Sequence, residues 1–82
     1  MKRIITIKVL GIGPDKNSAF DDALMTLHNL HYIEYNEFNN IQRWYYDEGD
    51  TSHYGEFGIA YSLEFDYISD EVYCDFTFYR MH

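Results

Sequence analysis

Residues 59–79 read IAYSLEFDYISDEVYCDFTFY, and this stretch decides the fold. Apolar and polar side chains alternate up to the Ser69 and Asp70 pair, and the alternation resumes beyond it. Successive side chains of a strand point to opposite faces of a sheet. The stretch therefore predicts a β-hairpin of strands 59–67 and 72–79, with one apolar face and one face of carboxylates and tyrosines.

A two-residue tip at Ser69 and Asp70 sets the register of this hairpin, and it places Glu64 opposite Asp75 on the polar face. The apolar face then holds the pairs Tyr61–Phe78, Leu63–Phe76, Phe65–Cys74 and Tyr67–Val72. Directly opposed like charges destabilise a sheet, by roughly tenths of a kcal/mol at an exposed site. Two explanations stay open: a functional surface that tolerates this cost, or neutralisation by a neighbouring cation, with the candidates Lys8, Arg43 and Arg80.

The first part of the chain predicts a strand followed by a helix. Residues 3–10 are apolar and β-branched, and the glycines at positions 11 and 13 end them in a turn. An apolar stripe with helical spacing then runs through residues 18–31, formed by Phe20, Ala23, Leu24, Leu27 and Leu30. We expect this helix to stop near His31, with an irregular or strand-like stretch over residues 32–40. The alternative is that Tyr35 and Phe38 continue the helical stripe.

The middle of the chain supplies the remaining strand. Residues 41–46, IQRWYY, have the composition of a strand, and residues 47–53 read as a polar loop. A helix with one apolar stripe needs a cover, and a sheet with one apolar face supplies it. The sequence thus predicts an α+β fold in β-α-β-β-β order. One helix packs on one face of a mostly antiparallel sheet, in a single small domain over residues 1–82.

The charge of the chain is acidic and uneven. The formal net charge is −8, and the segment 17–82 holds only Arg43 and Arg80 against thirteen carboxylates. Affinity for phosphates comes from Lys and Arg, so direct binding of nucleic acid or of an anionic membrane is disfavoured. A protein partner with a basic surface would be attracted. The alternative explanation is that the acidic surface only keeps the protein in solution.

The chemistry-bearing side chains do not form a recognisable active site. Cys74 is the one cysteine, which excludes an internal disulfide, fits a cytoplasmic protein and falls on the apolar face of the hairpin. His28, His31 and Glu34 have a spacing that can present metal ligands on a helix, but nothing closes the set. No nucleophile with a matching base is visible. We therefore expect no catalysis, no metal and no cofactor.

Tyrosines and carboxylates together form the strongest functional signal, because tyrosine is enriched at protein interfaces. In composition the chain resembles the small acidic proteins that bacteriophages make to bind and block host machinery. That resemblance implies an inhibitor acting as a nucleic-acid mimic, since carboxylates along strands can take the positions of phosphates. The expected partner-binding residues are Glu64, Asp66, Asp75, Tyr73 and Tyr79 on the hairpin, with Asp47, Glu48 and Asp50 in support.

The alternative function belongs to a different class. Exposed aromatic side chains can bury one another across a symmetric interface. In that case the chain is a subunit of a homo-oligomer, which encloses a small ligand between its copies. The mass of the purified protein in solution separates the two hypotheses.

Overall fold

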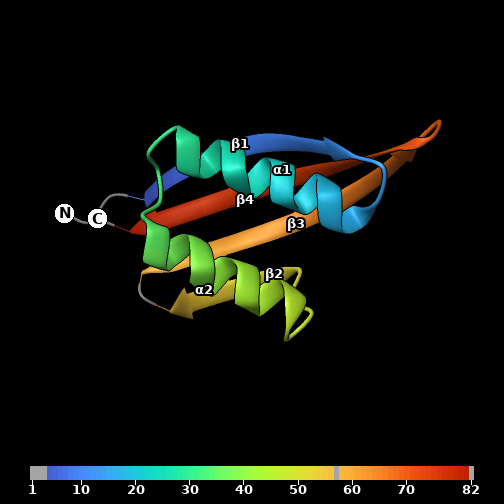
Figure 1. Cartoon of the computed structure of the whole chain (residues 1–82). Helices are drawn as coiled ribbons and strands as arrows, with labels where there is room; N and C mark the ends of the chain where they lie inside the picture. Colours follow the sequence, from blue (N-terminus) through green and yellow to red (C-terminus); the bar gives the residue numbers. More distant parts are fainter. Residues whose placement is uncertain (1–3, 57, 82) are drawn as a thin grey trace.

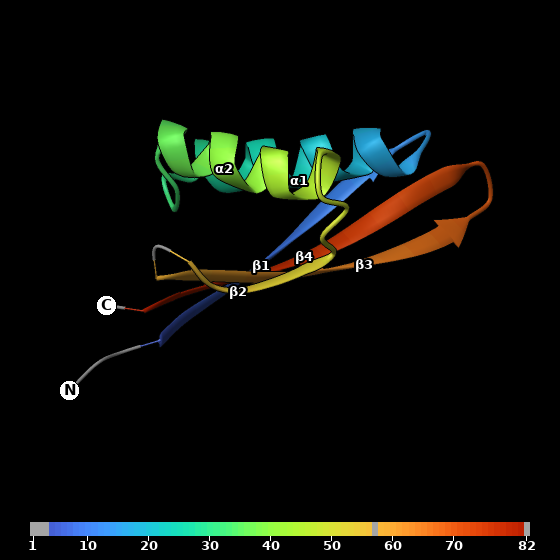
Figure 2. The same cartoon turned by 90° about the horizontal axis from the view of Figure 1, so that it is seen from below.

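The computed structural model of the protein describes residues 4–56 and 58–81. Its elements follow the order β1 (Ile4–Gly13), α1 (Lys16–Asn29), α2 (Tyr35–Tyr46), β2 (Ser52–Glu56), β3 (Ile59–Ile68) and β4 (Glu71–Met81). The four strands form one antiparallel sheet in the spatial order β1-β4-β3-β2 (Figure 1). Both helices lie on the same face of this sheet (Figure 2). The expected α+β fold, with helix packed on one face of an antiparallel sheet, is confirmed.

The hairpin of β3 and β4 has the register that the sequence predicts. Leu63 lies opposite Phe76, and Glu64 lies opposite Asp75. The other expected pairs, Tyr61–Phe78, Phe65–Cys74 and Tyr67–Val72, are present as well. Ser69 at the tip has a φ of 56°, which is the left-handed backbone conformation that tight hairpin turns require.

β1 runs beside β4 over its whole length, from Ile4 opposite Met81 to Gly13 opposite Val72. The strand is longer than residues 3–10, because its pairing continues through the two glycines. Gly11 is needed there, since a Cβ at this position would collide with the backbone oxygen of Ala19. At Gly13 a Cβ would lie 2.7 Å from the backbone nitrogen of Ala19. The glycines therefore let α1 lie directly on β1.

The strand expected over residues 41–46 is wrong, because this segment is part of the helix α2. The irregular or strand-like stretch expected over residues 32–40 is wrong from Tyr35 onward, where α2 begins. Phe38, Ile41, Trp44 and Tyr45 form an apolar stripe with helical spacing, and Ile41 and Trp44 are buried. The helix begins with a capping box, in which the backbone N–H of Glu34 donates to Glu37 Oε1 at 2.8 Å. The helical periodicity of all twelve residues of α2 thus outweighs the strand-like composition of its last six. The chain has a second helix where a strand was expected.

The polar loop expected over residues 47–53 ends earlier than predicted, because Ser52 and His53 already belong to β2. β2 forms the second edge of the sheet beside β3, with a bulge between His53 and Glu56. Gly55 has a φ of 90° in the bulged segment. This strand takes the place of the one expected at residues 41–46, so the sheet still has four strands in its described part.

The core fills the space between the helices and the inner face of the sheet. Its largest members are aromatic and stack in sequence, since Tyr61 lies between Trp44 and Phe76, at centroid distances of 6.2 and 5.6 Å. Phe20 of α1 continues the stack at 6.2 Å from Phe76. Cys74 is buried among these side chains. No helix in residues 4–56 or 58–81 combines the length and the apolar character needed to cross a membrane.

Candidate protein-binding surface

The outer face of the sheet is the face that points away from α1 and α2 (Figure 2). It is formed by the even-numbered residues of β1 and β3 and the odd-numbered residues of β4. On the inner face, alternate residues such as Leu63 and Phe76 are buried under the helices. On the outer face their neighbours Glu64 and Asp75 are exposed. The alternation in the sequence therefore places a whole row of polar side chains in the open.

Five of the expected partner-binding residues meet on this outer face. Glu64 and Asp75 are directly opposed, and Asp66 lies opposite Tyr73 one step nearer the hairpin tip. Tyr79 lies toward the other end, opposite Ala60 of β3. Strand geometry separates Glu64 from Asp66 by about 7 Å along one face. The structure thus brings carboxylates and phenol rings together in one register.

Lys8 shares the outer face with the opposed carboxylates. It lies on β1 opposite Thr77 of β4 and lines a hollow of about 410 Å³ together with Glu64, Asp75 and Tyr79. Of the three cations considered as neutralising partners, it is the one on this face. Arg43 lies on α2. Lys8 is therefore the candidate cation that lies on the same face as Glu64 and Asp75, and the carboxylates outnumber it.

Arg80 points to the helix side of the sheet and is already engaged there. Its guanidinium forms an ion pair with Glu37 of α2, and Nη1 donates to the backbone oxygen of Tyr32 at 3.2 Å. The same guanidinium lies 5.8 Å from the centre of the Phe78 ring. Arg80 thus ties the end of β4 to the helices and does not neutralise the outer face.

An apolar hollow of about 330 Å³ lies at one end of the outer face and shares Tyr79 with the charged hollow. Ile4, Ala60, Tyr79 and Met81 line it, together with Tyr54 of β2. Tyr54 is 73% exposed. No sequence pattern predicted this group, because Ile4 and Met81 come together only through the pairing of β1 with β4. The outer face thus combines a charged centre with an apolar end.

The three supporting carboxylates of the expected site lie elsewhere. Asp47, Glu48 and Asp50 belong to the connection from α2 to β2, on the helix side of the sheet. The backbone oxygen of Asp50 accepts a hydrogen bond from the Tyr61 hydroxyl at 3.1 Å, and Tyr61 faces the inner side. The Asp50 carboxylate lies 3.4 Å from His53 Nδ1. The structure therefore does not bring these carboxylates together with Glu64 and Asp75.

Tyr73 is held in place by its neighbour at the hairpin tip. Its hydroxyl donates to Glu71 Oε2 at 3.0 Å. This hydrogen bond to a carboxylate raises the pKa of Tyr73, since ionising the phenol would break the bond and oppose two negative charges. The hydrogen bond orients the Tyr73 ring toward Glu71 at the hairpin tip.

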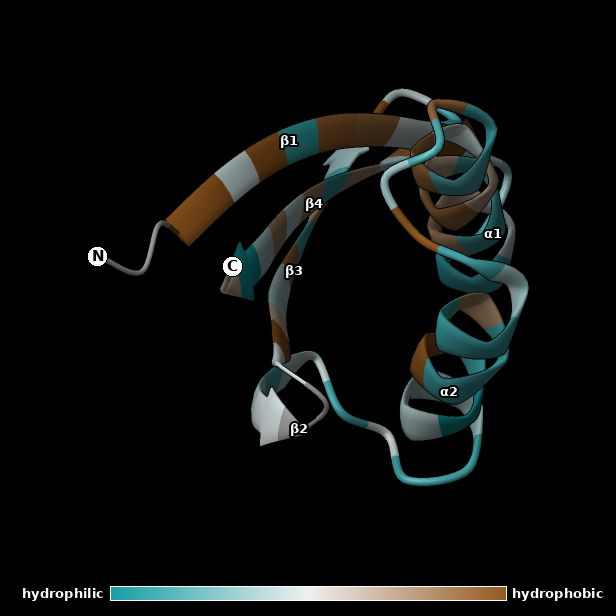
Figure 3. Cartoon of the chain, turned by 90° about the vertical axis from the view of Figure 1, so that its left-hand side faces the viewer, coloured by the Kyte–Doolittle hydropathy of each residue, from teal (hydrophilic) through white to brown (hydrophobic). Residues whose placement is uncertain are grey.

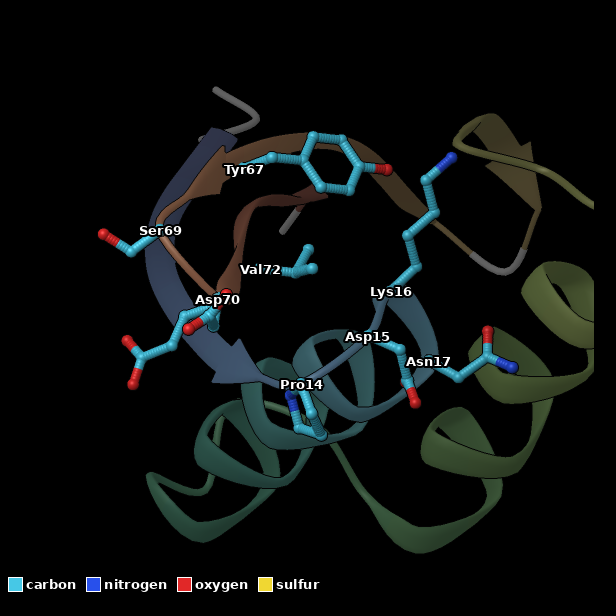
Figure 4. A pocket seen from close by; sticks show the side chains of 9 residues that line it. Pro14, Asp15, Lys16, Asn17, Tyr67, Ser69, Asp70 and Val72 are labelled. Carbon is cyan, nitrogen blue, oxygen red and sulfur yellow. The ribbon is translucent and has the colours of Figure 1, made fainter.

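A further hollow, of about 660 Å³, lies between the start of α1 and the hairpin tip (Figure 4). The side chains of Tyr67 and Val72 face it from the hairpin, and residues 14–17 line it from the other side. The Asp15 carboxylate caps α1 by accepting from the Ser18 N–H at 2.8 Å, which lowers the pKa of Asp15. The two segments that line this hollow are far apart in the sequence, so no local pattern predicted it.

His28, His31 and Cys74 occupy structural positions in the fold. The His28 ring lies edge-on to Phe38 at 5.4 Å, and His31 has a φ of 65° where the chain reverses after α1. Burial raises the pKa of the Cys74 thiol to about 12. Among residues 4–56 and 58–81, no three histidine, cysteine or carboxylate side chains gather in a way that could hold a metal ion.

Comparison with known proteins identifies no relative of the chain. No protein-family model, no curated protein and no solved structure matches the chain.

Proposed function

We propose that the protein is a small acidic binding protein that acts by covering a basic surface of a protein partner. One observation carries this proposal: the outer face holds Glu64, Asp66 and Asp75 in adjacent positions, and neither helix covers them. Opposite charge brings such surfaces together quickly and fixes their orientation. Binding of this kind needs neither catalysis nor a cofactor. We place it in the cytoplasm, where a lone reduced cysteine is ordinary.

The layout of the outer face also suggests what the partner presents. Tyr79 lines both the charged hollow and the apolar hollow beside it. A long basic side chain has an apolar stem and a charged end, and it packs well along such a border. Arginine is favoured, because its planar guanidinium stacks on aromatic rings and binds carboxylates with two hydrogen bonds. A protein surface that binds nucleic acid is rich in this residue.

The proposal is tested by charge reversal on the outer face. Glu64→Lys with Asp75→Lys should abolish the retention of partner proteins on the immobilised protein at low salt. The melting temperature should not fall, because both side chains are exposed. Retention by the unchanged protein should weaken strongly when the salt concentration is raised.

A matched control has the same net charge as the outer-face variant, but its two substitutions lie in the connection from α2 to β2. Asp47→Lys with Glu48→Lys alters the loop by an equal amount and should leave retention intact. Loss with the loop variant alone would place binding at the loop, and equal loss with both would show a dependence on net charge only. Either outcome contradicts the proposed face. Retention that double-stranded DNA displaces identifies the partner surface as a nucleic-acid site.

A further inference from the structure

β1 is an edge strand with apolar side chains exposed on both of its faces. Ile4 is 68% exposed on the outer face, and Ile5 is 39% exposed on the inner face. A hollow of about 180 Å³ lies beside Ile5 and Ile7. Figure 3 shows this hydrophobic first half of β1 extending away from both helices. An apolar strand with one unpaired edge is a template for pairing with another strand.

Two hydrogen bonds show which backbone groups of β1 point to the open edge. The Ile12 N–H donates to Asp22 Oδ2 at 3.0 Å, so it points away from β4. The N–H of Met81, which lies opposite Ile4, donates to Gly58 at 3.2 Å and therefore turns away from β1. Bonded and non-bonded pairs alternate along an antiparallel ladder. The backbone groups of all even-numbered residues of β1 thus face outward.

Among the described residues of β1, the open edge covers Ile4 to Leu10. Within the part of the chain that the structure describes, the outward N–H groups of Thr6, Lys8 and Leu10 make no hydrogen bond. Asp22 closes the edge at Ile12, because its carboxylate occupies the N–H there. The other edge of the sheet differs, since β2 is short and bulged and so is poorly suited to pairing.

The charge pattern leaves β1 as the part of the described fold at which a second copy of the chain can approach. The chain carries a net charge of −8, so two copies repel one another over most of their surface. Among the described helices and strands, β1 is the one without a carboxylate, and Lys8 is its one charged residue. An acidic chain can therefore approach a second copy closely at β1.

We propose that β1 pairs antiparallel with β1 of a second copy, over Ile4–Leu10, with Ile7 on the two-fold axis. Within the described residues this register pairs the outward backbone groups of Ile4, Thr6, Lys8 and Leu10, and it does not place Lys8 opposite its own copy. Ile4 then faces Leu10 of the second copy on the outer side, where both are exposed. Thr6 faces Lys8 of the second copy, which keeps the two lysines apart. Ile5 faces Val9 of the second copy on the inner side.

A single-cysteine variant tests the register directly. Ile7→Cys brings two thiols to a non-hydrogen-bonded pair, where the Cα atoms are about 4.5 Å apart and a disulfide fits. Mild oxidation should convert most of the protein to a covalent dimer. Ile5→Cys is the matched control, because its thiol faces Val9 of the second copy and should cross-link far less. Cys74 does not compete, since it is buried in the core.

A backbone variant tests the interface without cross-linking. The unchanged protein should sediment with twice the chain mass of 9.9 kDa. Thr6→Pro should return it to the mass of one chain, because proline lacks the N–H that pairing needs. The fold should survive, since this N–H points outward. Thr6→Val retains the N–H and should leave the dimer intact.

A one-chain mass at high protein concentration, with equal cross-linking of Ile7→Cys and Ile5→Cys, would refute the dimer. Fast amide exchange at Thr6, Lys8 and Leu10 in that protein would show that the edge is unpaired and open to an extended segment of another protein. The inference does not depend on the proposed function. Salt weakens binding to a basic partner but screens the repulsion between two acidic copies, so the two can fail separately.

Discussion

The two faces of the sheet are built by the same strands and obey different rules. Tyr61 on the inner face has no exposed area, whereas Tyr54 on the outer face is 73% exposed. Inner side chains are fixed by the helices that cover them, so their size and shape decide whether the chain folds. Outer side chains meet solvent, so their chemistry is free to serve a partner. Chemically similar residues therefore have different consequences on the two faces.

The largest effect is expected where the inner face has no room at all. Gly11→Ala places a methyl group against the backbone of Ala19 and Ala23, which cannot move without displacing α1. We expect a loss of about 3 kcal/mol or more in the free energy of unfolding, measured with urea. Ser62→Thr adds one methyl group on the outer face and should change stability by less than about 0.5 kcal/mol. Equal effects would erase the distinction between the faces.

Truncation of an aromatic side chain tests the same contrast by removal. Trp44 is 4% exposed and stacks on His53 at a centroid distance of 3.9 Å. Trp44→Ala should cost about 3–5 kcal/mol, because it leaves a cavity between α2 and the sheet. Tyr54→Ala on the outer face should cost less than about 0.5 kcal/mol. Thermal unfolding followed by circular dichroism gives both values, and a large loss at Tyr54 would contradict the open outer face.

A smaller effect is expected from one buried hydroxyl group. Tyr61→Phe removes the hydrogen bond to the Asp50 backbone oxygen and should cost about 1 kcal/mol at neutral pH. Burial raises the pKa of Tyr61 above the ordinary 10.0, so the unfolded chain loses this proton first. The stability due to Tyr61 is therefore present below pH 10.0 and is lost as the pH rises further. Unfolding measured up to strongly alkaline pH should show a shallower decline for Tyr61→Phe.

The smallest effect belongs to the opposed carboxylates on the outer face. Glu64→Gln with Asp75→Asn should raise the free energy of unfolding by a few tenths of a kcal/mol, since it removes like-charge repulsion. The gain should shrink in 1 M salt, where charges a few ångströms apart are screened. Asp66→Asn is the control, because Asp66 faces Tyr73 and not a second carboxylate. A destabilised double variant would show that Lys8 makes the pair favourable.

Sequence patterns predicted those parts of the fold that one local rule governs. The alternation over residues 59–79 predicted the hairpin, its register and its outward carboxylates, because strand geometry alone connects them. The stripe from Phe20 to Leu27 predicted α1 in the same way. Both patterns are long enough to exclude other structures.

The predictions of secondary structure were wrong for short segments whose sequence fits a helix and a strand, or a loop and a strand, equally well. The six residues IQRWYY have strand composition, but Trp44 and Ile41 are buried as one face of a helix that begins at Tyr35. β2 contains glycine and little apolar surface, so it becomes a strand by pairing with β3. The sequence left three cations as candidate neighbours of Glu64 and Asp75. The pairing of β1 with β4 places Lys8 on their face.

The topology of the sheet has a consequence for how the chain acquires its structure. Of the strands that the structure describes, β1 is synthesised first and its partner β4 last. Long-range contacts close slowly, so we expect the hairpin of β3 and β4 to form early and β1 to dock late. On the ribosome, β1 waits without a neighbour until nearly all of the described chain has emerged. Pulse-labelling by hydrogen exchange during refolding should then protect the amides of β3 before those of β1.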